Sequence, residues 1–479
     1  MSQDRLTALD ETFLHLERDG AHMHVASTVI FEGPAPEYED FLEHLESRLH
    51  LVPRFRQKLR FVPFGLNRPV WEDDPHLNLR YHVRHTSLPP PGTEDQLRTF
   101  AARVFSQRLD RSKPLWELWI VEGLKGGRFA IVGKSHHCLV DGVSGVDIAT
   151  VLYDTDPEPA VPPAPGGEWL PRPERSEADL AAEAVLDRFT NPADIAEGIG
   201  SLVRGPREIA ERAVGALGAI WEIAGTGLGA PSSPLNVPIG PHRRFAWVQG
   251  DLGDFKRIKK ELGGTVNDVV LAVVAGALAR YLRGRGQSTQ DLELRAMVPI
   301  SVRTEEERGA LGNRVSAMMV PLPLWCEDPV ERLRLITRTM GDLKSSRQAV
   351  GASLLTELAD FAPPTIAAQA ARLVPRQRFF NLVITNIPGP QYPLYVLGRE
   401  MHSLVPMVPL ADHQALCVGI MSYNGQINFG LIGDYDAVRD LDRLAEDLEA
   451  SIEELSEAAG GKRRRRPRRR APAPAQSSA

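Results

Sequence analysis

The alternation of apolar and polar positions predicts a unit of mixed helices and strands in the first third of the chain. Alternate residues of a strand face opposite sides, whereas helical residues three or four apart share a face. Phe41, Leu45 and Leu49 have the helical spacing, as do Leu97, Ala101 and Phe105. The predicted strands cover residues 25–31, 79–84, 118–122 and 128–135, and the predicted helices cover residues 36–52 and 94–109.

A second unit of the same kind is predicted after residue 241, beyond a proline-rich linker and a helical crossover. Thr265 is a predicted N-cap, and Asn424-Gly425 predicts a hairpin turn. We predict domains at 1–155 and 241–460, joined by 156–240 and followed by a disordered basic tail at 461–479. The predicted strands of the second unit are 245–248, 294–300, 315–320, 381–386, 416–423 and 426–432, and its helices are 254–262, 269–282, 329–345, 352–371 and 441–458.

Composition restricts the class of protein further. The 479 residues are 43% hydrophobic and 25% charged, which is typical of a globular protein with a large core. Three widely spaced cysteines, Cys138, Cys326 and Cys417, argue against a disulfide framework. The first residues show no apolar signal segment, and no uncharged apolar run is long enough to span a bilayer. We therefore expect a cytoplasmic protein.

Charge is distributed unevenly along the chain. Eight basic residues lie between Lys462 and Arg470, so a net charge of −6 leaves −14 on the remainder. An acidic body predicts that the folded part binds no nucleic acid. The basic tail has three open interpretations: a solvated disordered segment, a nucleic-acid contact, or a contact with an anionic membrane surface. An apolar stretch at 214–228 is either a core helix or a contact for lipid.

The candidate chemistry lies in the string from His136 to Gly142, which has the pattern HHxxxDG. If the preceding strand continues through the pair, His136 and His137 point to opposite faces, so one ring can enter a cavity. Gly142 allows a sharp turn, and Asp141 can hold it. A neutral imidazole can take a proton from a hydroxyl or thiol. A satisfied core histidine is the alternative interpretation.

A metal site at this string is disfavoured. Neighbouring strand residues face opposite ways, and no further Cys or His set with metal-ligand spacing occurs along the chain. Cys138 is a conceivable nucleophile, but on a continuing strand its side chain points to the opposite face from that of His137. A covalent intermediate on Cys138 is therefore not expected.

Several strings together resemble the bacterial wax ester synthase/diacylglycerol acyltransferase family. HHxxxDG alone would also fit condensation domains of peptide synthetases. The resemblance extends over nearly the whole chain up to about residue 458, but not to the arginine-rich tail. Besides HHxxxDG, the matching strings are Leu9-Asp10, Met23-His24-Val25, Pro114-Leu115-Trp116-Glu117, Asn267-Asp268-Val269-Val270, Gly312-Asn313-Arg314 and Thr385-Asn386-Ile387-Pro388-Gly389-Pro390.

The resemblance implies an α/β fold (an α+β sandwich) of two chloramphenicol acetyltransferase-like domains with a tunnel between them. His137 then corresponds to the base, while Asp141 turns away and pairs with an arginine, for which Arg303 is the candidate. The candidates for substrate binding are Asn267, Asp268, Ser422, Pro114 and Trp116, and a backbone N–H, Asn267 or Ser422 are candidate oxyanion donors.

Three functions remain in competition at this stage. The first is transfer of a long acyl chain from acyl-CoA, as co-substrate and without a further cofactor, to diacylglycerol or a fatty alcohol. The second is a condensation-type enzyme that acts on carrier-protein thioesters. The third is a non-catalytic protein of a lipid surface. The first predicts a peripheral position at the inner membrane or at lipid droplets.

Overall fold

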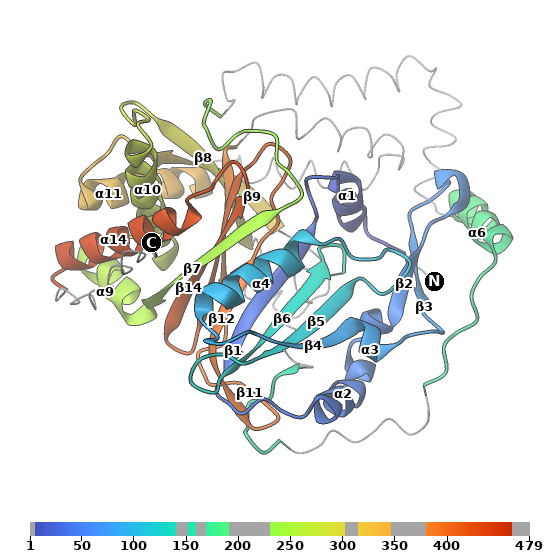
Figure 1. Ribbon diagram of the computed structural model, residues 1–479. Helices are drawn as coiled ribbons and strands as arrows, with labels where there is room; N and C mark the ends of the chain where they lie inside the picture. Colours follow the sequence, from blue (N-terminus) through green and yellow to red (C-terminus); the bar gives the residue numbers. More distant parts are fainter. Residues whose placement is uncertain are drawn as a thin grey trace, which may run out of the picture.

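Two six-stranded sheets, each with helices packed against it, organise the protein (Figure 1). The computed structural model describes residues 5–139, 152–159, 169–190, 230–301, 315–345 and 380–461. The sequence predictions for Asp141, Gly142, Arg303, the helix at 352–371, most of the crossover and the basic tail lie outside these ranges. The predicted α/β fold class is confirmed.

The first sheet has the order β11-β12-β1-β6-β5-β4. All neighbouring strands are antiparallel except β4 and β5. A separate hairpin pairs β2 (Gln57–Arg60) with β3 (Val70–Asp73). The strands of the sheet are β1 (His24–Phe31), β4 (Val83–Ser87), β5 (Trp116–Glu122), β6 (Phe129–His136), β11 (Tyr395–Val396) and β12 (Arg399–Met407).

The alternation of side chains along β1 gives this sheet two buried faces. Phe31 lies in the cluster that contains Phe41 of α2 (Tyr38–Glu46). Ile30 lies in the cluster that contains Leu97 of α4 (Glu94–Ser106). Two further helices belong to this unit, α1 (Ala8–Leu16) and α3 (Leu79–His82), and α6 (Glu177–Thr190) lies beside the β2–β3 hairpin (Figure 1). Burial on both faces explains why β1 is largely apolar.

The second sheet has the order β7-β14-β13-β10-β8-β9, with β8, β10 and β13 parallel. Its strands are β7 (Arg243–Asp251), β8 (Glu293–Ser301), β9 (Val315–Pro323), β10 (Leu382–Pro388), β13 (Leu416–Tyr423) and β14 (Gln426–Asp434). Its helices are α9 (Leu252–Leu262), α10 (Val266–Gly284), α11 (Pro329–Ser345) and α14 (Leu441–Ala458). Helix α10 is buried almost throughout and packs on α11 and α14. The predicted hairpin at Asn424-Gly425 is confirmed.

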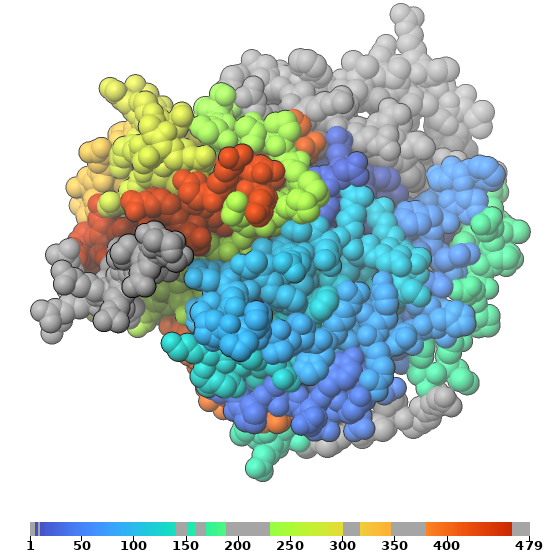
Figure 2. Space-filling view, viewed as in Figure 1, coloured from blue at the N-terminus to red at the C-terminus, as the bar shows by residue number. Residues whose placement is uncertain are grey.

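The two units pack directly against each other (Figure 2). Phe245 and Trp247 of β7 belong to the apolar cluster under α4. The backbone N–H of Arg243 donates to Ser106 Oγ at 2.9 Å, and the guanidinium of Arg243 donates to the Gly20 carbonyl. The junction therefore combines apolar burial with hydrogen bonds between the units.

Some local predictions were wrong. Residues 395–407, which the sequence analysis assigned to the second domain, form β11 and β12 of the first sheet, where β12 covers the free edge of β1. The predicted strand at 79–84 begins as α3, because Asn78 accepts a hydrogen bond from the Arg80 N–H and caps a helical turn. Helix α1 and the β2–β3 hairpin were not predicted.

Among the described helices, none is by itself long and apolar enough to cross a bilayer. Within the same described set, α9 and α10 taken as one segment are long and apolar enough, but the two helices are bent by 99° relative to each other.

Candidate active site

The HHxxxDG string begins where β6 ends. The sequence analysis supposed that the strand continues through both histidines, but β6 stops at His136, and residues 137–139 form a turn. Two backbone hydrogen bonds hold this turn against the sheet: His136 N–H donates to the Leu115 carbonyl at 2.9 Å, and His137 N–H donates to the Met23 carbonyl at 2.7 Å. The two rings therefore diverge because the chain turns.

His136 is a positioning residue in this geometry. Its side chain is only 1% exposed. The Cys138 backbone N–H donates to His136 Nδ1 at 3.1 Å, so Nδ1 is unprotonated and the ring hydrogen resides on Nε2. Nε2 lies 3.1 Å from Glu17 Oε2 and donates to it. One imidazole thus ties the turn to the end of α1.

Glu17 is the anionic anchor of this link. Arg111 donates to Glu17 Oε2 at 2.5 Å and to the Leu14 carbonyl at 3.2 Å, so it also caps the last turn of α1. Burial raises the pKa of Glu17, but hydrogen bonds from His136 and Arg111 outweigh burial and lower that pKa to about 2. Glu17 is therefore ionised at neutral pH and keeps His136 in one orientation.

Of the two adjacent histidines, His137 is half-buried, whereas His136 is buried. His137 stacks on Phe13 of α1, with ring centroids 3.8 Å apart and an interplanar angle of 19°. Burial lowers the pKa of His137 to about 4, so the ring is neutral at pH 7. Its Nδ1 has no hydrogen-bond partner within the described ranges. A neutral, oriented imidazole of this kind can accept a proton.

The thiol of Cys138 does not have the properties of a nucleophile. Cys138 is 3% exposed, and its Sγ lies 3.0 Å from His136 Nδ1. Burial raises the pKa of Cys138 well above its usual value, so the reactive thiolate is scarce. Among the described residues, no group of three or more His, Cys, Asp or Glu side chains could hold a metal ion.

The second unit places two amides next to each other. Asn267 is at the second position of α10, and Asn386 is near the end of β10. Asn386 Nδ2 donates to Asn267 Oδ1 at 3.3 Å, and both side chains are half-buried. In the described part of the chain, this hydrogen bond joins Asn267 to Asn386 rather than to either histidine. The pair remains a candidate for polar contact with substrate.

Asp268 and Ser422 have structural partners instead. Thr265 and Asp268 form a capping box, in which Asp268 Oδ2 accepts from the Thr265 N–H at 2.8 Å, and this confirms the predicted N-cap. Asp268 is 2% exposed, so we assign it to the helix and not to substrate. Ser422 Oγ accepts from the Gly389 N–H at 3.3 Å and from Gln391 Nε2 at 3.1 Å, so it holds the loop after β10.

Comparison with known proteins identifies the family. The model of the wax ester synthase/diacylglycerol acyltransferase catalytic domain matches residues 6–270, and the model of the C-terminal domain of the same family matches residues 311–456. The chain belongs to this family. It is therefore an acyltransferase, as the sequence analysis predicted.

Individual relatives agree with the family match. The chain is 34% identical to the protein named "Probable diacyglycerol O-acyltransferase tgs1" of Mycobacterium tuberculosis, over 98% of each chain. It is 35% identical to the one named tgs2 of the same organism, over 95% of this chain and 100% of the relative. The solved wax ester synthase/diacylglycerol acyltransferase of Marinobacter aquaeolei VT8 matches with a TM-score of 0.69 at 30% identity, over 95% of this chain and 100% of that one.

A more distant structure shares the fold alone. The starter condensation domain of rhizomide synthetase matches with a TM-score of 0.56 at 13% identity. The acyltransferase thus has the architecture of condensation domains as well as that of its own family.

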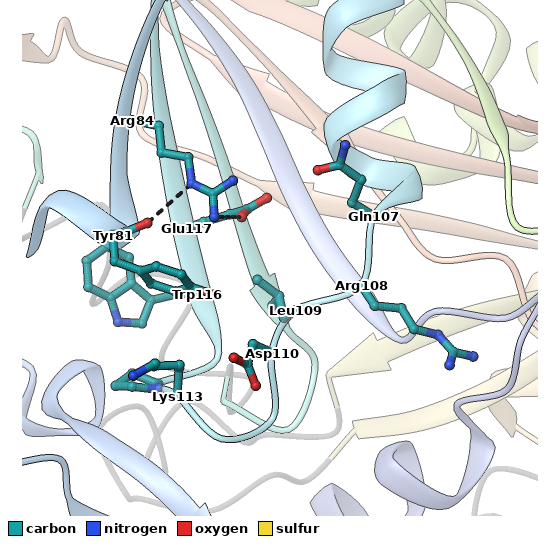
Figure 3. A pocket seen from close by; sticks show the side chains of 10 residues that line it. Tyr81, Arg84, Gln107, Arg108, Leu109, Asp110, Lys113, Trp116 and Glu117 are labelled. Carbon is teal, nitrogen blue, oxygen red and sulfur yellow. Dashed lines mark hydrogen bonds and ion pairs between the residues drawn. The ribbon is translucent and has the colours of Figure 1, made fainter. Parts of the chain in front are cut away.

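Pro114 and Trp116 line a cavity on the first unit of the acyltransferase (Figure 3). Trp116 is 1% exposed, its Nε1 donates to the Phe55 carbonyl at 2.8 Å, and its ring stacks on His82. Its indole is therefore chiefly part of the core, and a role in substrate binding stays a prediction.

Sequence reasoning missed Phe13, Glu17 and Arg111. Glu17 lies 119 residues before His136 and was not recognised, because no local pattern links the two. One signal was present. Glu17 directly follows the last residue of α1, and a carboxylate at the C-terminal end of a helix is unfavourable beside the helix dipole unless it has another partner.

Proposed function

We propose that this acyltransferase moves a long-chain acyl group from acyl-CoA to the hydroxyl of diacylglycerol, giving triacylglycerol, and that long-chain alcohols also serve as acceptors and give wax esters. The observation that carries the proposal is the neutral, half-buried His137 ring, held on a turn that His136 and Glu17 fix. Family membership supplies the reaction type, and the names of the relatives suggest the acceptor.

His137 acts in this proposal as the general base. It takes the hydroxyl proton while the acceptor oxygen forms a bond to the thioester carbonyl carbon. The tetrahedral intermediate then collapses, the carbon–sulfur bond breaks, and the proton passes from His137 to the departing thiolate of CoA. No acyl-enzyme is formed, since Cys138 is buried and its raised pKa keeps it protonated.

The state of the free enzyme suits this sequence of steps. The pKa of His137 is about 4, because burial against Phe13 disfavours the cation. At neutral pH, His137 is therefore neutral and able to accept a proton in almost all enzyme molecules. The imidazolium exists only between proton uptake and release, when the negative tetrahedral intermediate lies beside it and offsets its poor solvation.

A purified-protein assay tests the proposal. With palmitoyl-CoA and dioleoylglycerol, wild-type enzyme should form triacylglycerol, and a His137→Ala variant should lose roughly 10²–10⁴-fold in kcat. His85→Ala is the matched control, because His85 is an exposed histidine of the same sheet that pairs with Glu122. Triacylglycerol formation that survives in His137→Ala at the control's rate would contradict the assigned base.

The same assay separates the competing functions. Hexadecanol in place of dioleoylglycerol tests wax ester formation, and palmitoyl-loaded acyl carrier protein in place of palmitoyl-CoA tests a condensation-type donor. Lipid binding without turnover of any pair would indicate a non-catalytic protein. Because the proposed acceptors are membrane lipids, we also propose that the enzyme works at the cytoplasmic face of a membrane or at lipid droplets.

A further inference from the structure

A cavity of about 190 Å³ lies in the first unit, where α3, β4 and β5 meet the loop that follows α4 (Figure 3). The loop joins this cavity to the candidate active site. Its residue Leu115 accepts the His136 N–H, and its residue Arg111 binds Glu17. Since water occupies roughly 30 Å³ per molecule in the liquid, the space suits a small polar group rather than an acyl chain.

Three cations line the cavity: Arg84, Arg108 and Lys113. The guanidinium of Arg84 is oriented by its surroundings. It lies 5.4 Å from the centre of the Tyr81 ring and 5.0 Å from that of Trp119, and its Nε donates to the Tyr81 carbonyl at 3.2 Å. Aromatic contacts and one backbone acceptor thus fix the direction in which this cation points.

Both acidic residues that line the cavity interact with neighbouring protein groups. Glu117 lies 2.7 Å from the buried Nζ of Lys134 and 3.7 Å from Arg84. Asp110 Oδ1 accepts from the N–H and the hydroxyl of Ser112, at 2.9 and 2.7 Å. Both carboxylates thus have partners of their own, and the lining carries three cations against these two anions.

Of the three cations, Lys113 has the fewest interaction partners. Its Nζ lies 5.8 Å from the centre of the Tyr81 ring, and within the described ranges it makes no ion pair. Arg108 also lines the cavity, but its side chain is 44% exposed and its guanidinium faces Asp19 at 3.1 Å and Glu17 at 3.9 Å. An ammonium and a planar guanidinium around one small cavity are the groups that proteins use to bind phosphate.

We propose that this cavity is a phosphate-binding site of the acyltransferase. The shared chemistry is a phosphate ester, which comes either from CoA or from the headgroup of an anionic phospholipid. The inference rests on the proposed function only in the first case. The phosphate site was not predicted from the sequence, which named Pro114 and Trp116 only as candidates for substrate binding.

The test is binding without turnover, on the full-length protein and its Lys113→Gln variant. Calorimetry measures CoA binding, and sedimentation measures binding to vesicles of phosphatidylcholine with or without phosphatidylglycerol. Lys113→Gln should weaken one of these two interactions about tenfold, as expected for one lost charged contact. Lys125→Gln is the matched control, because Lys125 is exposed on the β5–β6 loop outside the cavity and should bind as wild type.

The outcomes are distinct. A loss confined to CoA identifies the phosphates of CoA as the ligand, and a loss confined to phosphatidylglycerol vesicles identifies a lipid headgroup. Unchanged binding of both ligands to Lys113→Gln overturns the phosphate site, as does an equal loss in Lys125→Gln. Binding that depends on Lys113 in a protein that forms no triacylglycerol would support the phosphate site and reject the proposed reaction.

Discussion

Replacing Glu17 by Gln should damage both stability and catalysis, because one carboxylate anchors the turn that bears His137. The side chain is 6% exposed and accepts from His136 and Arg111. Folding lowers its pKa from 4.5 to about 2, and one unit of pKa corresponds to about 1.4 kcal/mol. The ionised carboxylate therefore contributes about 3 kcal/mol at neutral pH, and Glu17→Gln should lose up to that amount.

The pH dependence follows from the direction of this shift. Because the pKa is lower in the folded protein, the stabilisation is complete above pH 4.5 and disappears as the pH falls toward 2. Urea unfolding followed by tryptophan fluorescence should therefore separate wild type from Glu17→Gln at pH 7. The difference between the two proteins should shrink below pH 4.5.

Activity should fall for a geometric reason. Without the carboxylate, His136 loses its charged acceptor and the turn after β6 is less restrained. A displacement of about 1 Å at the reacting centre lowers rates by up to roughly 10²-fold, so kcat for triacylglycerol formation should fall at least tenfold. The acyl-CoA KM should change little, because Glu17 is engaged by His136 and Arg111.

Glu122→Gln is the matched control for this experiment. Glu122 pairs with His85 at 2.7 Å in the same sheet, but both side chains are 38% exposed, and such a pair is worth about 0–1 kcal/mol. A Glu17→Gln enzyme that keeps the control's unfolding midpoint and the wild-type kcat would refute the assignment of Glu17 as the anchor.

Four further outcomes are expected. The rate of triacylglycerol formation should stay constant from pH 8 down to about pH 5 and fall only as His137 is protonated near pH 4. A fall centred near pH 6.5 would show that burial does not set the pKa of His137. Phe13→Ala should move the wild-type fall in rate to higher pH, as measured by the same pH profile, because removing the stacked ring lets water solvate the imidazolium. Cys138→Ala should retain most activity, and mass spectrometry that detects an acyl group on Cys138 would contradict direct transfer. His136→Ala should lower both the urea midpoint and kcat, whereas His137→Ala should lower kcat alone.

Local patterns predicted most helices and strands, because periodicity depends on neighbouring residues. The helices at 329–345 and 441–458 have the predicted bounds, and the Thr265 cap is as predicted. The identity of a strand's partner depends on distant segments instead. Residues 399–407 have an apolar pattern that suits a strand, yet nothing near them indicates that they pair with β1 across the boundary between the units.

The candidate site was predictable only in part for the same reason. His137 was selected by its spacing from Asp141 in the HHxxxDG pattern. The roles of Asp268 and Ser422 could not be distinguished from substrate binding by residue type, since a carboxylate or hydroxyl serves equally well in a cap or a loop. Only the folded structure shows that Asp268 is bonded to Thr265 and that Ser422 is bonded to Gly389.

The two adjacent histidines show how position, not residue type, assigns a role. The chain turns after His136, so one ring stays in the sheet and the other leaves it. A buried imidazole needs partners for its ring nitrogens, and Glu17 and the Cys138 N–H supply them. His137 instead meets the face of Phe13, which removes water without supplying a hydrogen bond to replace it. The first ring is thereby committed to structure, whereas Nδ1 of the second has no hydrogen-bond partner among the residues that the structure describes, so the second ring is the one that can accept a proton from a substrate.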